Sequence, residues 1–161
     1  IAEACSHPFF WSAAQRLEKV RGWKTSWRRD GNLKRRLTAH PNNVKQIVGK
    51  EKDGWLSKLD AVVAARLCDS GKEDGRRGYD GRDPLDLVRA IRNIFEHWFE
   101  RLAPDEAVLA LTGWDAEMRK GHASAEGQEM RAAAVARYFL GDRFRELLLV
   151  FEFAREWPSE A

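Results

Sequence analysis

Residues 83–102 constrain the fold of this chain most, because they have the pattern of one long amphipathic helix. Asp83 is a favourable N-cap, Pro84 suits the first helical position, and Pro104 disfavours a helical conformation in the residue before it. At about 100° per residue, the apolar residues share one broad side of this helix. They are Leu87, Val88, Ile91, Ile94, Phe95, Trp98, Phe99 and Leu102. We therefore predict that this side packs into a protein core.

The other side of the same helix gathers polar groups within an arc of roughly 140°. They are Asp86, Arg89, Arg92, Asn93, Glu96, His97 and Glu100. Asn93 and His97 are four residues apart, so their side chains should be neighbours, and Arg92 lies one turn from Glu96. A solvated helix surface has the same pattern, and we expect that explanation to hold for Asp86 and Glu100. Spacing alone does not decide between solvation and chemistry for Arg92, Asn93 and His97.

The remaining chain also predicts helices. Ser12 and Gln15 have the spacing of a capping box, which predicts a helix over residues 13–21 that Gly22 ends. Further helices are expected at 33–39, 44–48, 54–69, 104–111, 129–140 and 143–157, with turns at 40–43 and 141–142 and a loop at 120–128. The helix at 54–69 should bury Trp55, Leu59, Val62, Val63 and Leu67. No alternating strand pattern is present, so we predict an all-α, single compact helical domain over residues 1–161.

Residues 70–83 predict a surface loop, because they contain four glycines and are otherwise mostly charged. Tyr79 is the one aromatic residue in this loop. A tyrosine in such a place either faces a ligand or packs its ring against the protein, and composition leaves both roles open. Basic residues interleaved with Trp23 and Trp27 at 23–36 would suit a nucleic-acid backbone, although a partly buried helical segment with a solvated basic rim explains them somewhat better.

Composition limits the classes of function. A net charge of +3 permits an RNA or acidic partner without requiring one. Cys5 and Cys68 have neither metal nor redox spacing, which favours a reducing compartment. The sequence contains no long apolar run, no signal-peptide pattern at Ile1, no glycine-rich phosphate loop and no metal-ligand cluster. We therefore expect no bound metal, no cofactor and no membrane contact by this segment, and the chain has the character of a mature piece or a fragment.

Four separate motifs resemble the kinase-extension nuclease (KEN) domain of ribonuclease L and of the inositol-requiring sensor of the unfolded-protein response. They are HPFFWS at 7–12, Tyr79, DLVRAIRN at 86–93, and Glu96-His97. Tyr138-Phe139, Arg143-Phe144 and Leu147-Leu148 resemble the last two helices of that family. Two positions depart from it: Arg145 stands where the family usually has proline, and Glu152 stands where it often has a tyrosine. The resemblance implies that residues 1–6 are the remnant of a preceding kinase helix.

The resemblance also implies metal-independent endoribonuclease activity, as in mRNA processing of the unfolded-protein response or in RNA decay. Tyr79 would be the general base, His97 the general acid, Arg92 the phosphate ligand that also supports Tyr79, and Asn93 an orienting group. RNA contacts would come from Arg76, Arg77, Arg82 and Arg89. The implied partners are RNA, a second copy of the chain when active, and an upstream kinase domain, in the cytoplasm or at the cytosolic face of the endoplasmic reticulum. The alternatives are a non-catalytic helical module that dimerises or docks RNA, and a generic helical RNA-binding domain.

Overall fold

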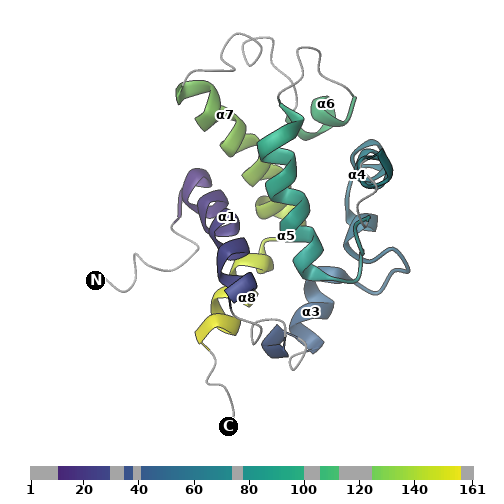
Figure 1. The fold of residues 1–161 in the computed structure, drawn as a ribbon, viewed down its shortest axis with the longest axis vertical. Helices are drawn as coiled ribbons and strands as arrows, with labels where there is room; N and C mark the ends of the chain where they lie inside the picture. The colour runs from purple at the N-terminus through teal and green to yellow at the C-terminus, as the bar shows by residue number, and fades with distance from the viewer. Residues whose placement is uncertain are drawn as a thin grey trace.

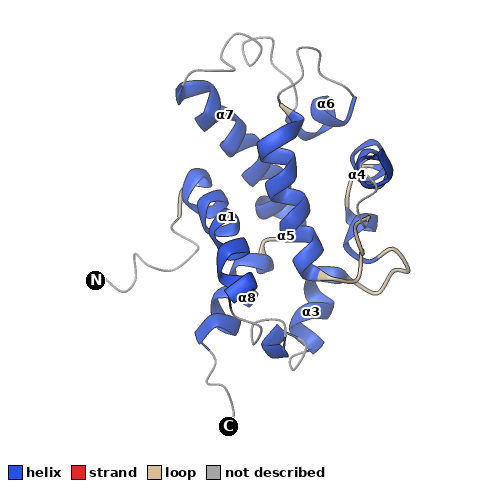
Figure 2. Ribbon diagram, in the orientation of Figure 1, coloured by secondary structure: helices blue, strands red, loops and turns tan. Residues whose placement is uncertain are grey.

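The computed structural model describes residues 11–29, 35–37, 41–73, 78–99, 106–112 and 125–156. Across these ranges the chain is helical apart from short connections, and they contain no strand (Figure 2). The elements are α1 (Ala13–Arg29), α3 (Pro41–Val48), the 3₁₀ helix η3 (Gly54–Lys58), α4 (Ala61–Glu73), α5 (Pro84–Asn93), the π-helical turn η4 (Ile94–Trp98), α6 (Glu106–Thr112), α7 (Ala125–Ala136), the π-helical segment η6 (Arg137–Arg143) and α8 (Glu146–Glu156). The prediction of a compact all-α fold is confirmed.

Helix α5 runs through the middle of the molecule, with the other helices arranged around it (Figure 1). Helix α1 packs against both α5 and α7, and α3 packs against α5 and α8. The predicted apolar side of α5 is buried: Leu87, Val88, Ile91, Ile94, Trp98 and Phe99 all belong to the core, and Phe95 is half-buried against it. Trp23 of α1 stacks on Phe151 of α8, with ring centroids 4.5 Å apart. One core therefore joins the two ends of the described chain.

The start of α1 is as predicted, and its end is not. The Ser12 backbone N–H donates to Gln15 Oε1 (2.7 Å), and the Gln15 N–H donates back to Ser12 Oγ (3.2 Å), which is a capping box. The prediction that Gly22 ends this helix is wrong, because α1 continues to Arg29. A glycine inside a helix costs only about 1 kcal/mol relative to alanine. Val20 and Trp23 are buried on either side of Gly22, and their burial outweighs that cost.

The predicted helix at 54–69 is two elements. η3 ends at Lys58, Leu59 is extended, and α4 begins at Ala61 with the Asp60 carbonyl accepting from the Val63 and Ala64 N–H groups. This break rotates Val62 out of the predicted core stripe, so that its exposed fraction is 38%. The other four residues of that stripe are buried: Trp55, Leu59, Val63 and Leu67.

Several predicted turns and loops are helical. Residues 41–43 open α3, residues 125–128 open α7, and residues 141–142 belong to η6, so that the last helix begins at Glu146 rather than at 143. Glycine at 141 does not stop the helical segment because its neighbours Phe139, Leu140 and Phe144 are buried and hold it in place. Residues 35–37 are helical as predicted, and α6 confirms the predicted helix over the residues that are described there.

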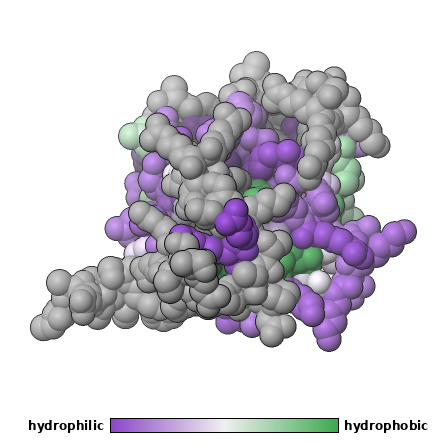
Figure 3. All heavy atoms as spheres, turned by 60° about the horizontal axis from the view of Figure 1, so that its bottom comes forward, coloured by the Kyte–Doolittle hydropathy of each residue, from purple (hydrophilic) through white to green (hydrophobic). Residues whose placement is uncertain are grey.

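Few large apolar side chains are exposed in the described part of the chain. Val62 of α4 and Leu109 of α6 are exposed to 38% each. On the face shown in Figure 3, hydrophilic residues predominate among the described atoms. None of the described helices combines the length and the apolar character needed to cross a membrane.

Candidate active site

The N-terminus of α5 fixes the position of the loop that carries Tyr79. Asp83 caps the helix, since its Oδ1 accepts from the Leu85 N–H at 2.9 Å, and Pro84 occupies the first turn, both as predicted. The Asp83 N–H donates to the Asp80 carbonyl at 3.0 Å, which closes a turn directly before the helix. The loop residues 78–82 therefore enter α5 in one defined direction.

η3 holds this loop from the other side. The Trp55 indole Nε1 donates to the carbonyls of Asp80 (3.0 Å) and Asp83 (3.1 Å), and the Trp55 backbone N–H donates to the Gly81 carbonyl (2.8 Å). Gly54 has a φ of +58°, and a Cβ atom there would lie 1.9 Å from the Gly81 carbonyl oxygen. Only glycine fits such a close approach of two backbones. The loop is thus attached to a segment about 25 residues earlier in the chain.

Asp86 is buried, so the prediction that it is solvated is wrong. Its Oδ2 accepts from the Asp80 N–H at 2.7 Å, and its Oδ1 lies 3.5 Å from Arg89 Nη1. Burial of a carboxylate is tolerated where it is paired and hydrogen-bonded in this way. The sequence placed Asp86 on the polar arc of the helix but could not show that the preceding loop folds back over that arc.

Arg89 completes the attachment of the loop. Its guanidinium lies over the Tyr79 ring, 4.4 Å from the ring centroid, and its Nη2 donates to the Gly78 carbonyl at 3.0 Å. The Tyr79 and Trp55 rings also meet in a T-shaped arrangement, with centroids 6.3 Å apart. The ring is therefore packed between a cation and an indole, which is one of the two roles that the sequence left open.

The hydroxyl of Tyr79 reaches the polar side of α5. The Asn93 amide Nδ2 donates to Tyr79 Oη at 2.9 Å. Both side chains are half-buried, so each is also partly accessible from solvent. The structure thus brings together two of the four predicted catalytic residues, which lie 14 positions apart in the sequence.

Arg92 pairs with Glu96, one turn later, as the spacing predicted. Arg92 Nε and Glu96 Oε2 are 2.8 Å apart, with side-chain exposures of 16% and 30%. Sequence reasoning named Arg92 as the cation that supports Tyr79. The cation that lies on the Tyr79 ring is instead Arg89, whereas the Nε of Arg92 is engaged by a carboxylate.

His97 is exposed and lies on a π-helical turn, so the prediction of an uninterrupted α-helix over 83–102 is wrong. α5 ends at Asn93, and η4 follows as a π-helical turn, in which backbone hydrogen bonds join residues five apart rather than four apart. Ile94, Trp98 and Phe99 are all buried around this turn, and Arg66 of α4 lies 4.8 Å from the Trp98 ring centroid. The turn also changes the register of His97 relative to Asn93. π-helical turns within α-helices occur often at functional sites.

The predicted RNA-binding arginines differ in their surroundings. Arg82 is exposed and its Nε lies 3.4 Å from the Lys52 carbonyl oxygen, whereas Arg89 is engaged by the Tyr79 loop. Arg76 and Arg77 lie outside the described residues, as do residues 1–10, which include most of the HPFFWS motif. In the ranges that are described, no three His, Cys, Asp or Glu side chains are grouped so that they could hold a metal ion.

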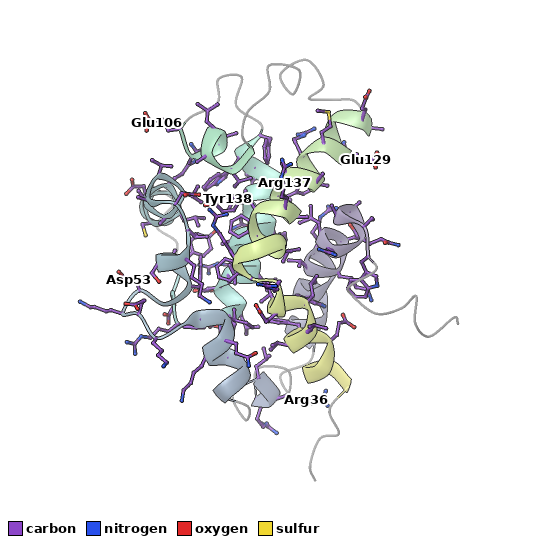
Figure 4. The ribbon with its side chains drawn as sticks, turned by 180° about the vertical axis from the view of Figure 1, so that it is seen from behind. Arg36, Asp53, Glu106, Glu129, Arg137 and Tyr138 are labelled. Atoms are coloured by element: carbon purple, nitrogen blue, oxygen red, sulfur yellow. The ribbon has the colours of Figure 1, made fainter. Side chains whose placement is uncertain are left out.

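A second polar cluster, which sequence reasoning missed, joins η6 to the start of α4. The Tyr138 hydroxyl donates to Asp60 Oδ2 (2.6 Å) and accepts from the Asp60 N–H (3.0 Å), while Arg143 lies over the Tyr138 ring and donates to the same carboxylate (2.8 Å). Tyr138 is labelled in Figure 4, which shows the molecule from the side opposite to Figure 1. Burial, and then the hydrogen bond to Asp60, raises the pKa of Tyr138 to about 12. Tyr138 is therefore poorly suited to accept a proton.

The fold and the site together define a compact all-α domain in which a loop tyrosine is attached to a helix that bears Arg92, Asn93 and the turn with His97. No protein-family model matches the chain, and no solved structure does so either.

The chain is similar to part of a longer protein that is named as a kinase. The chain is 31% identical over 110 residues to the probable serine/threonine-protein kinase ireA of Dictyostelium discoideum, and this alignment covers 66% of the chain. The aligned part makes up 10% of the length of that kinase. A distant relation to one part of a large kinase agrees with the resemblance to a domain that accompanies kinases.

Proposed function

We propose that this chain is a KEN-type, metal-independent endoribonuclease. The hydrogen bond between Tyr79 Oη and Asn93 Nδ2 is the observation that carries the proposal. This hydrogen bond joins a tyrosine from an otherwise charged loop to α5. The same helix bears Arg92, the proposed phosphate-binding residue, and continues into η4, which bears His97, the proposed proton donor. The distant similarity to a kinase supports the same family.

The chemistry needs no cofactor because RNA carries its own nucleophile. Tyr79, as phenolate, takes the proton of a ribose 2′-hydroxyl, and the 2′-oxygen attacks the adjacent phosphorus. The bond from phosphorus to the 5′-oxygen breaks, and His97 in its imidazolium form protonates that leaving oxygen. The products are a 2′,3′-cyclic phosphate and a 5′-hydroxyl. At the end of the step Tyr79 is protonated and His97 is neutral, so one proton has been taken up and one has been released.

Charge on the site assists both transfers. The Arg89 guanidinium lies 4.4 Å from the centroid of the Tyr79 ring, so positive charge is close to the group that takes the proton. Arg92 offers a planar fork of donors to the phosphate oxygens, whose negative charge increases during attack. Asn93 positions Tyr79 through its amide.

The remaining parts of the proposal concern assembly and setting. The similar protein is named as a probable serine/threonine-protein kinase, which supports a kinase domain in the native protein, and the family resemblance implies that this domain lies upstream. Activity would require a homodimer, as the family resemblance implies, and the substrate would be a stem-loop or single-stranded RNA in the cytoplasm or at the cytosolic face of the endoplasmic reticulum.

One experiment tests the reaction. The chain is incubated with a stem-loop RNA in EDTA, and the product ends are analysed by their sensitivity to phosphatase and kinase treatment. We expect cleavage with cyclic phosphate and 5′-hydroxyl ends, while a DNA copy of the substrate remains intact. Cleavage of the DNA, or a strict need for magnesium, would contradict the mechanism. Binding without cleavage would favour a non-catalytic RNA-docking module.

A further inference from the structure

Two arginines from different helices converge on one carboxylate beside the proposed site. Glu96 lies in η4, with Oε2 at 2.8 Å from Arg92 Nε and Oε1 at 4.0 Å from Arg21 Nε. Arg21 comes from the middle of α1, and its guanidinium lies 5.3 Å from the centroid of the Phe95 ring. The residue after Glu96 is His97, the proposed general acid.

The guanidinium of Arg21 is only partly hydrogen-bonded in this arrangement. Arg21 Nε is buried and makes no hydrogen bond to any described residue, since the 4.0 Å separation from Glu96 Oε1 is too long for one. Arg21 Nη1 is engaged by Glu18 at 3.0 Å, and the Glu18 side chain is 73% exposed. A buried guanidinium nitrogen that lacks an acceptor is costly, so an acceptor that approaches it more closely would be stabilised.

We propose that Arg21 and Arg92 form a phosphate-binding pair and that Glu96 occupies it in the free protein. A phosphodiester carries one negative charge and two non-bridging oxygens, as the Glu96 carboxylate carries one charge and two oxygens. RNA would displace Glu96 without changing the charge balance between the two arginines, and its second oxygen would supply the acceptor that Arg21 Nε lacks. The proposal rests on the proposed RNA-binding function and names Arg21 as a further RNA-binding residue.

Accessibility permits this exchange. The side chains of Arg21 and Glu96 are 39% and 30% exposed, so Glu96 can turn towards solvent while Arg92, at 16%, stays in place. Glu96 lies on a π-helical turn rather than in a regular α-helix.

Binding to an RNA that cannot be cleaved tests the proposal separately from catalysis. The probe is a fluorescent stem-loop with 2′-O-methyl groups throughout, and its dissociation constant is measured by anisotropy at several salt concentrations. Glu96→Gln keeps the size and an acceptor for Arg92 but removes the competing charge, so we expect binding about three- to tenfold tighter. Arg21→Gln should weaken binding about tenfold, the low end for a charge-assisted hydrogen bond, and should lower the salt dependence by about one phosphate contact.

Matched controls exclude an effect of net charge. Glu18→Gln makes the same charge change at the other partner of Arg21, but in solvent, and should alter binding by less than about twofold. Arg145→Gln removes an arginine that is 73% exposed, with the same small effect expected. Arg21→Lys, which keeps the charge and loses the planar fork, should weaken binding by an intermediate factor even if Arg21→Gln folds poorly.

The outcomes separate the two proposals. Equal tightening by Glu96→Gln and Glu18→Gln, or equal weakening by Arg21→Gln and Arg145→Gln, would overturn the phosphate-binding pair. The expected binding pattern in a chain that does not cleave RNA would leave the pair standing and contradict the nuclease. An absence of RNA binding by the parent chain would overturn both.

Discussion

Replacing Tyr79 with phenylalanine should separate the chemistry of the hydroxyl from the packing of the ring. The ring contacts with Trp55 and Arg89 remain, and only the hydrogen bond from Asn93 is lost. Because both partners are half-buried, the freed amide of Asn93 can bond to water. The free energy of unfolding should fall by no more than about 1 kcal/mol, or about 3 °C in melting temperature for a chain of this size. The loss of a general base should lower the cleavage rate by about 10²–10⁴-fold.

Tyr138→Phe is the matched control, because the chain has only these two tyrosines. Tyr138 is buried, and the substitution removes the donor to Asp60 Oδ2 and the acceptor for the Asp60 N–H. Arg143 still pairs with Asp60, so we expect a loss of about 2 kcal/mol in the free energy of unfolding. At a temperature where both variants are folded, its cleavage rate should stay within a few fold of the parent.

The two measurements are urea unfolding followed by circular dichroism and the initial rate of stem-loop cleavage in EDTA. We expect opposite results for the two variants: Tyr79→Phe should be stable and inactive, and Tyr138→Phe should be less stable and active. Cleavage by Tyr79→Phe at the parent rate would refute its role as base. A large loss of stability in Tyr79→Phe would mean that the hydroxyl serves the fold instead.

Four further expectations can be measured with the same assays. His97→Ala should leave the circular dichroism spectrum unchanged, because His97 is exposed, and should lower cleavage by about 10²–10⁴-fold; an unchanged rate would reject it as the acid. Trp98→Ala should cost about 3–5 kcal/mol, since Trp98 is buried, and a small change in melting would contradict its core role. The pKa of Tyr138 is raised to about 12, so the stabilisation of the folded protein by the protonated hydroxyl should be complete below about pH 10 and should be lost as the pH rises towards 12. The difference in the free energy of unfolding between the parent and Tyr138→Phe should therefore shrink over that interval, and a constant difference would contradict this expectation. Cleavage per protomer should rise with protein concentration if a dimer is the active form, and a constant value in a protein that sediments as a monomer throughout would exclude that requirement.

The sequence predicted those parts of the fold that depend on local patterns. The apolar side of α5, the Asp83 cap and the capping box at Ser12 follow from spacing and short-range hydrogen bonds, and all three are confirmed. Helix ends were predicted less well, because tertiary burial decides them. Gly22 lies within α1 since Val20 and Trp23 are buried around it, which no local propensity reveals.

The candidate site was predicted as a set of residues but not as a geometry. Asn93 and Tyr79 were both named, yet their contact depends on a loop whose path is fixed by Trp55 and Gly54, which the sequence offered no reason to associate with it. The burial of Asp86 follows from the same loop path. The prediction also placed residues 83–102 at the constant spacing of an α-helix, about 100° per residue, so it could not include the π-helical turn at His97.

The residues that fix the Tyr79 loop connect the stability of the core to the geometry of the site. Trp55 is fully buried, contacts the Tyr79 ring in a T-shaped arrangement, and donates its indole N–H to the two carbonyls that flank the turn before α5. Asp86 and Arg89 hold the same loop from α5 itself. A tyrosine on a glycine-rich loop would ordinarily sample many positions, and its hydroxyl would seldom lie at 2.9 Å from Asn93. These attachments reduce that freedom before any substrate binds, which is the pre-organisation that proton transfer requires. Gly81 of the loop and Gly54 of η3 therefore serve the close approach of the two backbones, while the position of Tyr79 is set by the side chains packed around it.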